Sequence, residues 1–365
     1  MKVKKSFHRN FKLQGKTFSS SFDLISYSEE FSKDITHFLK EWFDNNDFVV
    51  VKTSGSTGEP KKIHLQKKHM ENSAKATGAF FNLFEKTTAL LCMSTEFIAG
   101  KMMLVRALIL GWELDIVTPS SNPIKGINKI YDFCAMVPLQ LHNSLNEIHK
   151  IKKIIVGGGV VSNDILKYIQ NVDTEIFATY GMTETITHIA IKKLNNWDIK
   201  GVKGDNSGNI QISTVVSNSK YRALPNVRFS HDSRGCLIIL APLVSDKKLI
   251  TNDIVKLIND TEFDWLGRYD NIINSGGIKL IPEQIEEKLS TIIKERFFVA
   301  GIPDKILGEK LMLIYEGEKD PFLLRKIQKF GMLTKFEKPK EISFLSKFIN
   351  TPTEKINRKE TIKLL

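Results

Sequence analysis

Nine residues from Thr53 to Lys61, TSGSTGEPK, combine four hydroxyl side chains, two glycines and a lysine. In such a loop the backbone N–H groups and hydroxyls donate to phosphate oxygens, while Lys61 supplies positive charge. The loop is not of the Walker A type, because Pro60 replaces its second glycine and Lys62 its Ser or Thr. We interpret the segment as a phosphate-binding loop; a flexible Ser/Gly turn is the alternative.

A second segment, TYGMTE from Thr179 to Glu184, has the residues for nucleotide and metal chemistry. Gly181 permits a close backbone approach, Thr183 can donate to a phosphate oxygen, and Glu184 can hold Mg²⁺. By itself the segment also fits a turn at a strand end with a surface glutamate.

Three further positions carry weaker signals. Asp253, in LITNDIV, can accept both hydroxyls of a ribose, although a solvated turn aspartate is the alternative. The segment from 267 to 282, GRYDNIINSGGIKLIP, offers Arg268 for ribose or phosphate and two glycines for close approach to another molecule. It also fits a plain hairpin. Lys355, in TPTEKINRKE, is either catalytic or an ordinary exposed lysine.

The elements that position these residues alternate between strands and helices. Apolar runs predict strands at 48–52, 113–117, 151–156, 175–178, 236–240 and 254–258, and helical periodicity appears at 69–84 and 104–110. Glycine or hydroxyl residues follow several strands, which indicates an α/β fold with ligands beyond the carboxyl ends of the strands. We expect a surface excursion at 195–208.

The character of the sequence changes after Arg268. An amphipathic helix is expected at 283–293, with strands at 297–301 and 310–315. This pattern predicts a small α+β domain, so we expect a large α/β N-terminal domain at 1–269, shortened at its N-terminus, and a small domain at 270–365.

Composition restricts the class of protein. The 365 residues are 42% hydrophobic and 26% charged, as in soluble proteins, and no apolar run approaches the roughly 20 residues of a membrane span. The basic start lacks the apolar stretch of a secretion signal, so we expect a cytoplasmic protein without stable membrane insertion. Three scattered cysteines and eight unclustered histidines predict no transition-metal site. The net charge of +12 favours anionic partners, but the lysines are spread along the chain, which argues against nucleic acid.

Together, and in this order, the motifs resemble those of the adenylate-forming superfamily of acyl-CoA synthetases, luciferases and peptide-synthetase adenylation domains. The match is collinear from about Val49 to the end of the chain. The resemblance implies a two-step reaction, in which ATP and Mg²⁺ activate a carboxylic acid as an acyl-adenylate and a thiol, that of coenzyme A, then takes the acyl group.

The resemblance also implies roles for single residues. The loop residues that match the family's binding loop for the β- and γ-phosphates are Ser54, Gly55, Ser56, Thr57, Gly58 and Lys61. The segment flanking adenine matches Gly157, Gly158 and Gly159. Tyr180 is then expected to stack on adenine, Thr183 to touch the α-phosphate and Glu184 to bind Mg²⁺.

Further along the chain, Asp253 and Arg268 match the ribose-binding pair and Asp270 the hinge between the domains. Gly276 and Gly277 would line the path of the thiol. Lys355 matches the lysine that bridges the substrate carboxylate and the α-phosphate.

The chain departs from the family pattern at three places. Glu354 stands where a glycine usually precedes the final lysine, and Asn252 replaces the glycine of the usual TGD motif. The first 48 residues replace a longer N-terminal region, so one subdomain is expected to be reduced. None of these departures removes a proposed catalytic group.

Within the superfamily, the segment 97–111 is similar to the substrate-side helix of o-succinylbenzoate–CoA ligases of menaquinone biosynthesis. The residues that carry this similarity are Phe97, Ala99, Gly100 and Arg106, together with the runs MVPLQ (136–140) and GMTET (181–185), so that Gly181 also joins the expected acid pocket. That acid has a second carboxylate, which needs a polar or positive partner. The candidates, each with an ordinary structural role as its alternative, are Lys101, Arg106, Gln140, His142 and His188.

Other functions stay open at this stage. The chain also fits a ligase for another acid, a stand-alone adenylation domain that loads a carrier protein, or a catalytically silent nucleotide-binding relative. A silent relative is disfavoured because the proposed catalytic and binding residues are all present: Lys61, Glu184, Asp253, Arg268 and Lys355. The sequence does not predict an oligomeric state.

Overall fold

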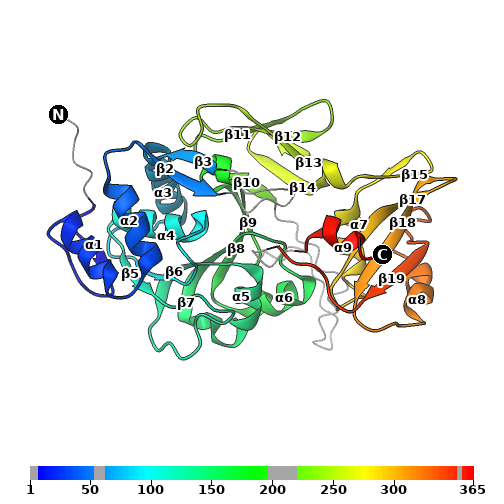
Figure 1. Cartoon of the computed structure of the whole chain (residues 1–365), viewed down its shortest axis with the longest axis horizontal. Coiled ribbons are helices and arrows are strands. Elements are labelled where there is room, and N and C mark those ends of the chain that lie inside the picture. Colours follow the sequence, from blue (N-terminus) through cyan, green and yellow to red (C-terminus); the bar gives the residue numbers. More distant parts are fainter. Residues whose placement is uncertain (1–6, 53–61, 196–219, 352–355) are drawn as a thin grey trace, which may run out of the picture. The chain divides into compact units, whose positions relative to one another are not determined.

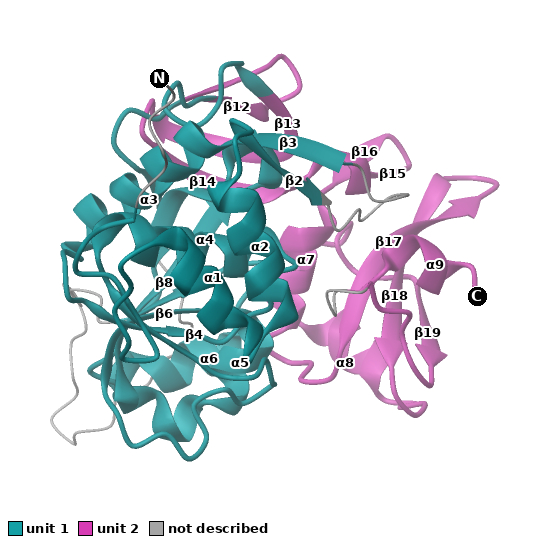
Figure 2. Cartoon of the chain, turned by 60° about the vertical axis from the view of Figure 1, so that its left-hand side comes forward, with its two compact units in different colours: residues 1–53, 61–228, 240–249 teal, residues 54–60, 229–239, 250–365 magenta. Residues whose placement is uncertain are grey.

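The structure, a computed structural model, describes residues 7–52, 62–195, 220–351 and 356–365 (Figure 1). It divides into two compact units, coloured separately in Figure 2. The first unit comprises residues 1–53, 61–228 and 240–249, and the second comprises residues 54–60, 229–239 and 250–365. A large mixed α/β part and a smaller β-rich C-terminal part are present, as the sequence predicts. The expected boundary between residues 269 and 270 stays a prediction.

A mixed sheet forms the centre of the first unit. Its strand order is β1-β5-β4-β6-β7-β8-β9-β10. The strands from β1 to β8 pair in parallel, and β9 and β10 continue the sheet antiparallel. Their bounds are β1 Lys12–Leu13, β4 Thr88–Leu91, β5 Glu113–Ile116, β6 Tyr131–Met136, β7 Ile151–Val156, β8 Glu175–Gly181, β9 His188–Lys193 and β10 Tyr221–Ala223. Parallel strands place their carboxyl ends at one edge, where ligands of such sheets bind.

Helices accompany this sheet, with bounds α1 Ser21–Glu29, α2 Lys33–Phe43, α3 Lys67–Phe81, α4 Ile98–Leu110, α5 Pro138–Asn143 and α6 Asn163–Tyr168, and the short 3-10 segments η1 Leu145–Lys150, η2 Ile169–Asn171 and η3 Thr183–Thr185. α4 packs against α3 and is buried from Gly100 to Leu108. It ends at Gly111, whose φ of 71° suits a residue without a side chain. α4 starts six residues before the predicted helix, because its first turn lacks a polar side-chain cap that would mark it.

The apolar run predicted as a strand at 48–52 forms β2 (Phe48–Lys52). It pairs antiparallel with β3 (Lys62–Gln66) in a separate two-stranded sheet. The last pair of the ladder is Lys52↔Lys62, so the strands on either side of the predicted phosphate loop lie side by side. The loop itself, residues 53–61, lies outside the described residues.

Within the second unit, one group of strands pairs in the order β14-β13-β12-β11. A sheet of its own has the order β16-β15-β18-β17, with β19 beside β18. The bounds are β11 Arg228–His231, β12 Cys236–Leu240, β13 Leu249–Asn259, β14 Glu262–Arg268, β15 Ile273–Ser275, β16 Ile278–Leu280, β17 Phe297–Asp304, β18 Gly308–Glu316 and β19 Glu341–Leu345. The helical segments are η4 Tyr269–Asn271, α7 Pro282–Leu289, α8 Leu323–Lys329 and α9 Arg358–Ile362. The strands predicted at 236–240, 254–258, 297–301 and 310–315 are therefore confirmed, and the predicted helix at 283–293 ends at Leu289.

Each unit has its own apolar core. In the first unit, β6 and β7 pack with α6 and η2 around fully buried residues such as Ile154 and Ile169. In the second, α7 and α8 pack on the β15–β18 sheet around Leu289 and Leu313. None of the described helices is long and apolar enough to cross a membrane.

Candidate functional site

The predicted adenine-flanking glycines lie at the carboxyl edge of the parallel strands. Gly157 follows β7 and donates its N–H to Met136 O at the end of β6, at 3.1 Å. A side chain there would meet Thr179 Oγ1 of β8, since an added Cβ would lie 2.8 Å from it. Thr179 in turn donates to Val156 O at 3.1 Å. Gly158 has a φ of 82°, which favours glycine. The three strands thus hold an exposed backbone segment without side chains.

The turn after β8 carries one half-buried, one exposed and one fully buried polar side chain. Thr183 is half-buried and Glu184 exposed, and neither side chain has a hydrogen-bond or ion-pair partner among the described residues. Thr185 is fully buried: its Oγ1 accepts from Met182 N at 3.0 Å and lies 2.7 Å from Thr187 O. The hydrogen bonds of Thr185 therefore stabilise the turn that carries Thr183 and Glu184. The sequence analysis gave Thr185 no separate role.

Ile186 completes this turn in a strained conformation. Its φ is 67° and ψ −63°, and the N–H of Thr187 donates to Thr185 O across it at 2.8 Å. This is the rare γ-turn with positive φ, which is costly for a β-branched residue. Ile186 is 1% exposed, so packing holds it in place. Such strain collects at functional sites, where the surroundings enforce one geometry.

Gly181 is required by close packing of the same turn. An added Cβ would lie 2.1 Å from Thr187 O, and the β8–β9 register shifts between Tyr180 and Gly181. Tyr180, the predicted adenine-stacking residue, is half-buried, with its ring centroid 5.8 Å from that of Tyr221 in β10.

The turn also lies against β3. β3 follows segment 53–61 along the chain, so the strand that leads out of the predicted phosphate loop packs against the turn that carries Thr183 and Glu184. Ser54, Gly55, Ser56, Thr57, Gly58 and Lys61 themselves lie outside the described residues. Their roles stay predictions.

A buried polar network lies beneath the turn. Arg106 of α4 is 1% exposed, and it donates from Nε to Thr77 Oγ1 and from Nη2 to Thr187 Oγ1, each at 3.3 Å. His188 Nε2 lies 3.2 Å from Thr77 Oγ1, and its Nδ1 lies 3.1 Å from Thr187 Oγ1. Because Thr77 donates its own hydroxyl to Ser73 O, His188 must donate from Nε2, and in the neutral ring Nδ1 then accepts from the Thr187 hydroxyl.

Electrostatics supports this assignment. Burial, and then the charge of Arg106, hold the pKa of His188 well below its usual range. Burial also lowers the pKa of Arg106 to about 9, so the guanidinium remains charged at neutral pH. Within the described part of the chain no carboxylate pairs with Arg106, and its Nη1 makes no hydrogen bond. An almost fully buried cation without a counter-ion is unusual.

The remaining candidates for the acid pocket differ in environment. Lys101 is 5% exposed, with Nζ 3.9 Å from Glu41 Oε2, and burial lowers its pKa. Gln140 donates to Cys92 O and Ser120 O, each at 3.0 Å, which joins α5 to the segments that follow β4 and β5. His142 lies exposed on α5. Gln140 thus has the structural role that was its alternative.

At the start of α4, Phe97 is the N-cap and is 42% exposed, and Ala99 is also exposed. Gly100 is buried, and an added Cβ would lie 2.2 Å from Ser94 O. Glycine is needed here so that the first turn can pack on the segment after β4.

The predicted ribose residues meet in the second unit. β13 and β14 pair with Asp253 opposite Arg268, and Arg268 Nη1 lies 3.7 Å from Asp253 Oδ1. Trp265 Nε1 donates to the same oxygen at 3.2 Å. This role of Trp265 was missed, since an indole in a strand signals packing alone. Arg268 Nη2 donates to Asp270 Oδ2 at 2.9 Å, which links the predicted ribose pair to the predicted hinge.

The other C-terminal candidates are only partly described. Gly276 and Gly277 form the turn between β15 and β16, with φ values of 58° and 81°, and an added Cβ at Gly277 would meet no described atom within 4 Å. Lys355 lies outside the described residues. Its flanks, Asn350 and Ile356, form an antiparallel bridge.

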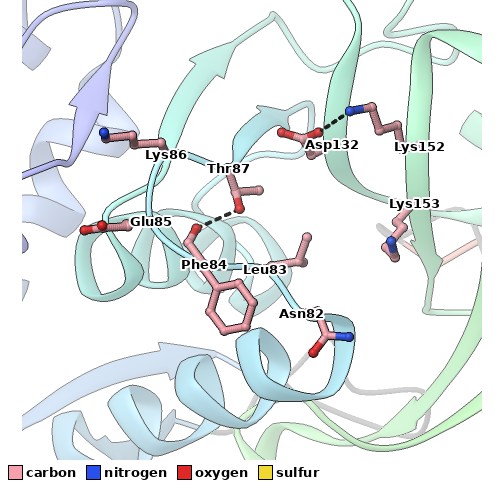
Figure 3. Close-up of a pocket in the computed structure, with 9 residues that line it drawn as sticks. All are labelled: Asn82, Leu83, Phe84, Glu85, Lys86, Thr87, Asp132, Lys152 and Lys153. Carbon is pink, nitrogen blue, oxygen red and sulfur yellow. Dashed lines mark hydrogen bonds and ion pairs between the residues drawn. The ribbon is translucent and has the colours of Figure 1, made fainter.

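A hollow of about 400 Å³ lies at the opposite edge of the first sheet, at the amino ends of β4, β6 and β7 (Figure 3). Asp132 and Lys152, which line it, form an ion pair at 2.8 Å. Lys153, also in its wall, pairs with Glu175 Oε2 at 3.1 Å. These lysines are neutralised by neighbouring carboxylates, and none of the predicted site residues lines the hollow.

Comparison with known proteins decides the family. The family model described as AMP-binding enzyme matches residues 6–213, more than half of the chain. The chain belongs to the AMP-binding enzymes. The resemblance to the adenylate-forming superfamily is thereby confirmed.

Individual relatives of this AMP-binding enzyme agree. An acyl-CoA synthetase (AMP-forming)/AMP-acid ligase II-like protein from Dyadobacter fermentans is 33% identical, over 90% of this chain and 93% of that chain, with a TM-score of 0.56. The 2-succinylbenzoate–CoA ligase of Lactococcus lactis is 24% identical over 364 residues, which cover 93% of this chain and 76% of the relative. The o-succinylbenzoate coenzyme A synthetase from Bacillus subtilis, in complex with ATP and magnesium ion, has a TM-score of 0.71 at 18% identity, over 94% of this chain and 82% of that one. This last likeness shows the fold.

The residues of this AMP-binding enzyme fit a Mg²⁺ ion that arrives with a nucleotide. Mg²⁺ is usually held by one or two carboxylates together with substrate phosphates and water. The exposed carboxylate of Glu184, which has no ion-pair partner among the described residues, meets that requirement beside Thr183. In the described ranges no group of three or more His, Cys, Asp or Glu side chains is placed to hold a metal by itself.

Proposed function

We propose that this AMP-binding enzyme is an acid–CoA ligase that forms an acyl-adenylate and produces AMP. The observation that carries the proposal is the turn η3, which exposes Thr183 and Glu184 next to the strand leading out of the Ser/Thr/Gly loop. A hydroxyl donor and a carboxylate for Mg²⁺ then lie in the turn that packs against β3, the strand that follows the predicted phosphate loop in the sequence. The Dyadobacter relative, named as an AMP-forming acyl-CoA synthetase-like protein, supports the same chemistry.

In the first half-reaction a carboxylate oxygen attacks the α-phosphorus of ATP, and the bond to the β-phosphate oxygen breaks to release pyrophosphate. The protein contributes by positioning the reactants and neutralising charge with Lys61 and Lys355. A Mg²⁺ ion held at Glu184 would offset the charge of the phosphates. Asp253 and Arg268 hold the ribose in this proposal, and Tyr180 stacks on adenine.

In the second half-reaction the C-terminal part turns about Asp270, and the sulfur of coenzyme A enters beside Gly276 and Gly277. The thiolate attacks the acyl carbonyl carbon, the bond to the phosphate oxygen breaks, and AMP leaves. The thiol proton passes to solvent.

For the acid we propose o-succinylbenzoate. The support is Arg106, whose almost fully buried guanidinium has no described carboxylate partner and whose Nη1 makes no described hydrogen bond. A site that holds such a cation gains from an anionic ligand and rejects a neutral one, because the cation would otherwise stay unpaired. The second carboxylate of the acid would supply that anion. The name of the Lactococcus lactis relative points to the same acid.

The test is a coupled assay of pyrophosphate release with ATP, Mg²⁺ and a panel of acids, followed by assay of the thioester. We expect o-succinylbenzoate to react far better than benzoate, acetate, long-chain fatty acids or its analogue esterified at the second carboxylate. Coenzyme A and a pantetheine-loaded carrier protein are compared as acceptors. Efficient use of benzoate or a fatty acid, with none of o-succinylbenzoate, would refute the acid but leave the adenylation chemistry. No pyrophosphate release with any acid would refute both.

A further inference from the structure

Asn252 occupies the position where the family's usual TGD motif has glycine, and its side chain makes contacts that glycine cannot make. Its Nδ2 donates to both carboxylate oxygens of Asp270, at 3.1 and 3.2 Å. Its Oδ1 accepts from Arg234 Nη1 at 3.1 Å, which settles the orientation of the amide. Arg234 is itself fixed by Asp232 at 2.8 Å and stacks on Tyr269, with its guanidinium carbon 5.0 Å from the ring centroid. The hydrogen bond from Arg234 therefore orients the Asn252 amide so that its nitrogen faces Asp270.

The strand pairing explains this geometry. Asp253 lies opposite Arg268 in the β13–β14 ladder, so Asn252 lies beside the first residues after β14. Those residues are η4, which contains Asp270. Thr251, on the other side of Asp253, is anchored to Leu237 O at 2.9 Å. Thr251, Asn252 and Asp253 thus act in turn as an anchor to β12, a donor to Asp270 and a partner of Arg268.

Arg268 connects the two acidic residues. Its Nη2 donates to Asp270 at 2.9 Å and its Nη1 lies 3.7 Å from Asp253. A ribose bound to Asp253 and Arg268 must share this guanidinium with Asp270. Asn252 has no such competition, because its Nδ2 lies within hydrogen-bonding distance of both carboxylate oxygens of Asp270 and its Oδ1 is taken by Arg234. When Arg268 turns to a nucleotide, Asn252 remains to hold the Asp270 carboxylate.

We propose that Asn252 is a positioning residue that holds Asp270 while a nucleotide occupies the ribose site, and so slows the passage from adenylation to thioester formation. The inference rests on the proposed function, in which Asp270 is the hinge and Asp253 binds the ribose. Rotation at Asp270 must break both amide contacts. In an enzyme with glycine at 252, the same rotation would break only the contact between Asp270 and Arg268.

The test uses the full-length enzyme with Asn252→Gly and Asn252→Asp. The first removes the contacts, and the second keeps the shape but places a like charge against Asp270. Acyl-adenylate is formed first, coenzyme A is then added, and thioester formation is followed in a single turnover. Because the contacts are partly exposed, we expect the rate constant to rise roughly 2- to 5-fold in both variants. The rate of adenylation should change less than twofold.

A second readout does not depend on catalysis. In the free enzyme, amide hydrogen exchange of segment 269–273 should be faster by a similar factor in both variants. Asn259→Gly is the matched control: it makes the same change in β13, but its side chain contacts Thr261 and Glu262 instead of Asp270. This control should alter neither measurement.

Unchanged exchange in 269–273 together with an unchanged rate of thioester formation would overturn the inference. An equal fall in both half-reactions would also overturn it, because that result indicates general loss of structure. If the wild-type enzyme released no pyrophosphate with any acid, the proposed function would fail, whereas the exchange measurement would still decide whether Asn252 holds Asp270.

Discussion

Thr185 accepts the backbone N–H of Met182 at its Oγ1, at 3.0 Å, from a fully buried position directly after Glu184. The two residues that the turn exposes, Thr183 and Glu184, therefore depend on a hydroxyl that never reaches solvent. Ile186 adds a strained turn whose geometry that hydroxyl helps to enforce.

The first prediction follows from this contact. Thr185→Val keeps the shape but leaves the Met182 N–H without an acceptor, at a cost of about 1–3 kcal/mol. We expect kcat/KM for Mg·ATP to fall about tenfold, with a higher requirement for Mg²⁺, because Glu184 is no longer held in place. Thr185→Ser retains the hydroxyl, so its kcat/KM for Mg·ATP should stay within about threefold of wild type. The measurement compares kcat/KM of the two variants across Mg²⁺ concentrations. Equal kinetics for Val and Ser would contradict this role.

The second prediction concerns Arg106. Arg106→Met should raise KM for o-succinylbenzoate about 30-fold or more, since truncating one partner of a buried charge pair costs about 2–5 kcal/mol. KM for ATP should change little. The analogue esterified at the second carboxylate is the control, because it has no charge to lose and should be used equally poorly by both enzymes. An equal loss with both acids in a folded variant would assign Arg106 a purely structural role.

The third prediction is a pH dependence of stability. His188 is held neutral, with its pKa well below 6.5, the usual value, whereas the unfolded chain has an ordinary histidine there. The unfolded state therefore binds more protons below about pH 6.5, and the free energy of unfolding falls as pH falls, by up to about 1.4 kcal/mol per pH unit. Urea denaturation between pH 7.5 and 5 should show that the free energy of unfolding falls with pH. In His188→Gln the fall should be smaller by the contribution of this histidine. Parallel curves for the two proteins would show that His188 is not the group involved.

The fourth prediction tests Lys355. If this lysine bridges the carboxylate and the α-phosphate, Lys355→Ala should lose adenylation about 10²-fold or more, as expected for an electrostatic contact made in the transition state. Thioester formation from supplied acyl-adenylate should largely survive. Lys359→Ala, a change of the same kind four residues later in α9, is the control and should leave both steps intact. A similar loss of both steps in Lys355→Ala would remove the proposed role.

Local pattern was sufficient for strands such as β2 and β7 and for the order of the motifs, but it gave no prediction for β4, β6 or β9. β2 is a largely apolar run followed by a hydroxyl residue, and β7 is rich in isoleucine and valine and followed by glycines, so composition and flanking residues identify them. Periodicity alone missed the start of α4, because a helix buried on nearly all sides lacks an amphipathic period, whereas the family resemblance placed a helix at 97–111.

The supporting residues of the site depended on contacts between distant parts of the chain. Arg106 meets Thr187, 81 residues away, and Asn252 meets Asp270, 18 residues away. No local rule reports such a pair. In the sequence, Asn252 stood out only as a departure from a motif. Its contact with Asp270 follows from the register of β13 and β14, which the sequence does not give.

The short strand β1 has a consequence for association between chains. Lys12 and Leu13 pair with Glu113 and Leu114, and this pairing covers the outer edge of β5. A chain shortened past Leu13 would expose the N–H and C=O groups of β5, together with the apolar surface that Leu13 covers. Exposed edges of this kind pair with other chains. Two residues near the beginning of the sequence thus protect the enzyme from aggregation, and an affinity tag belongs ahead of them and not in their place.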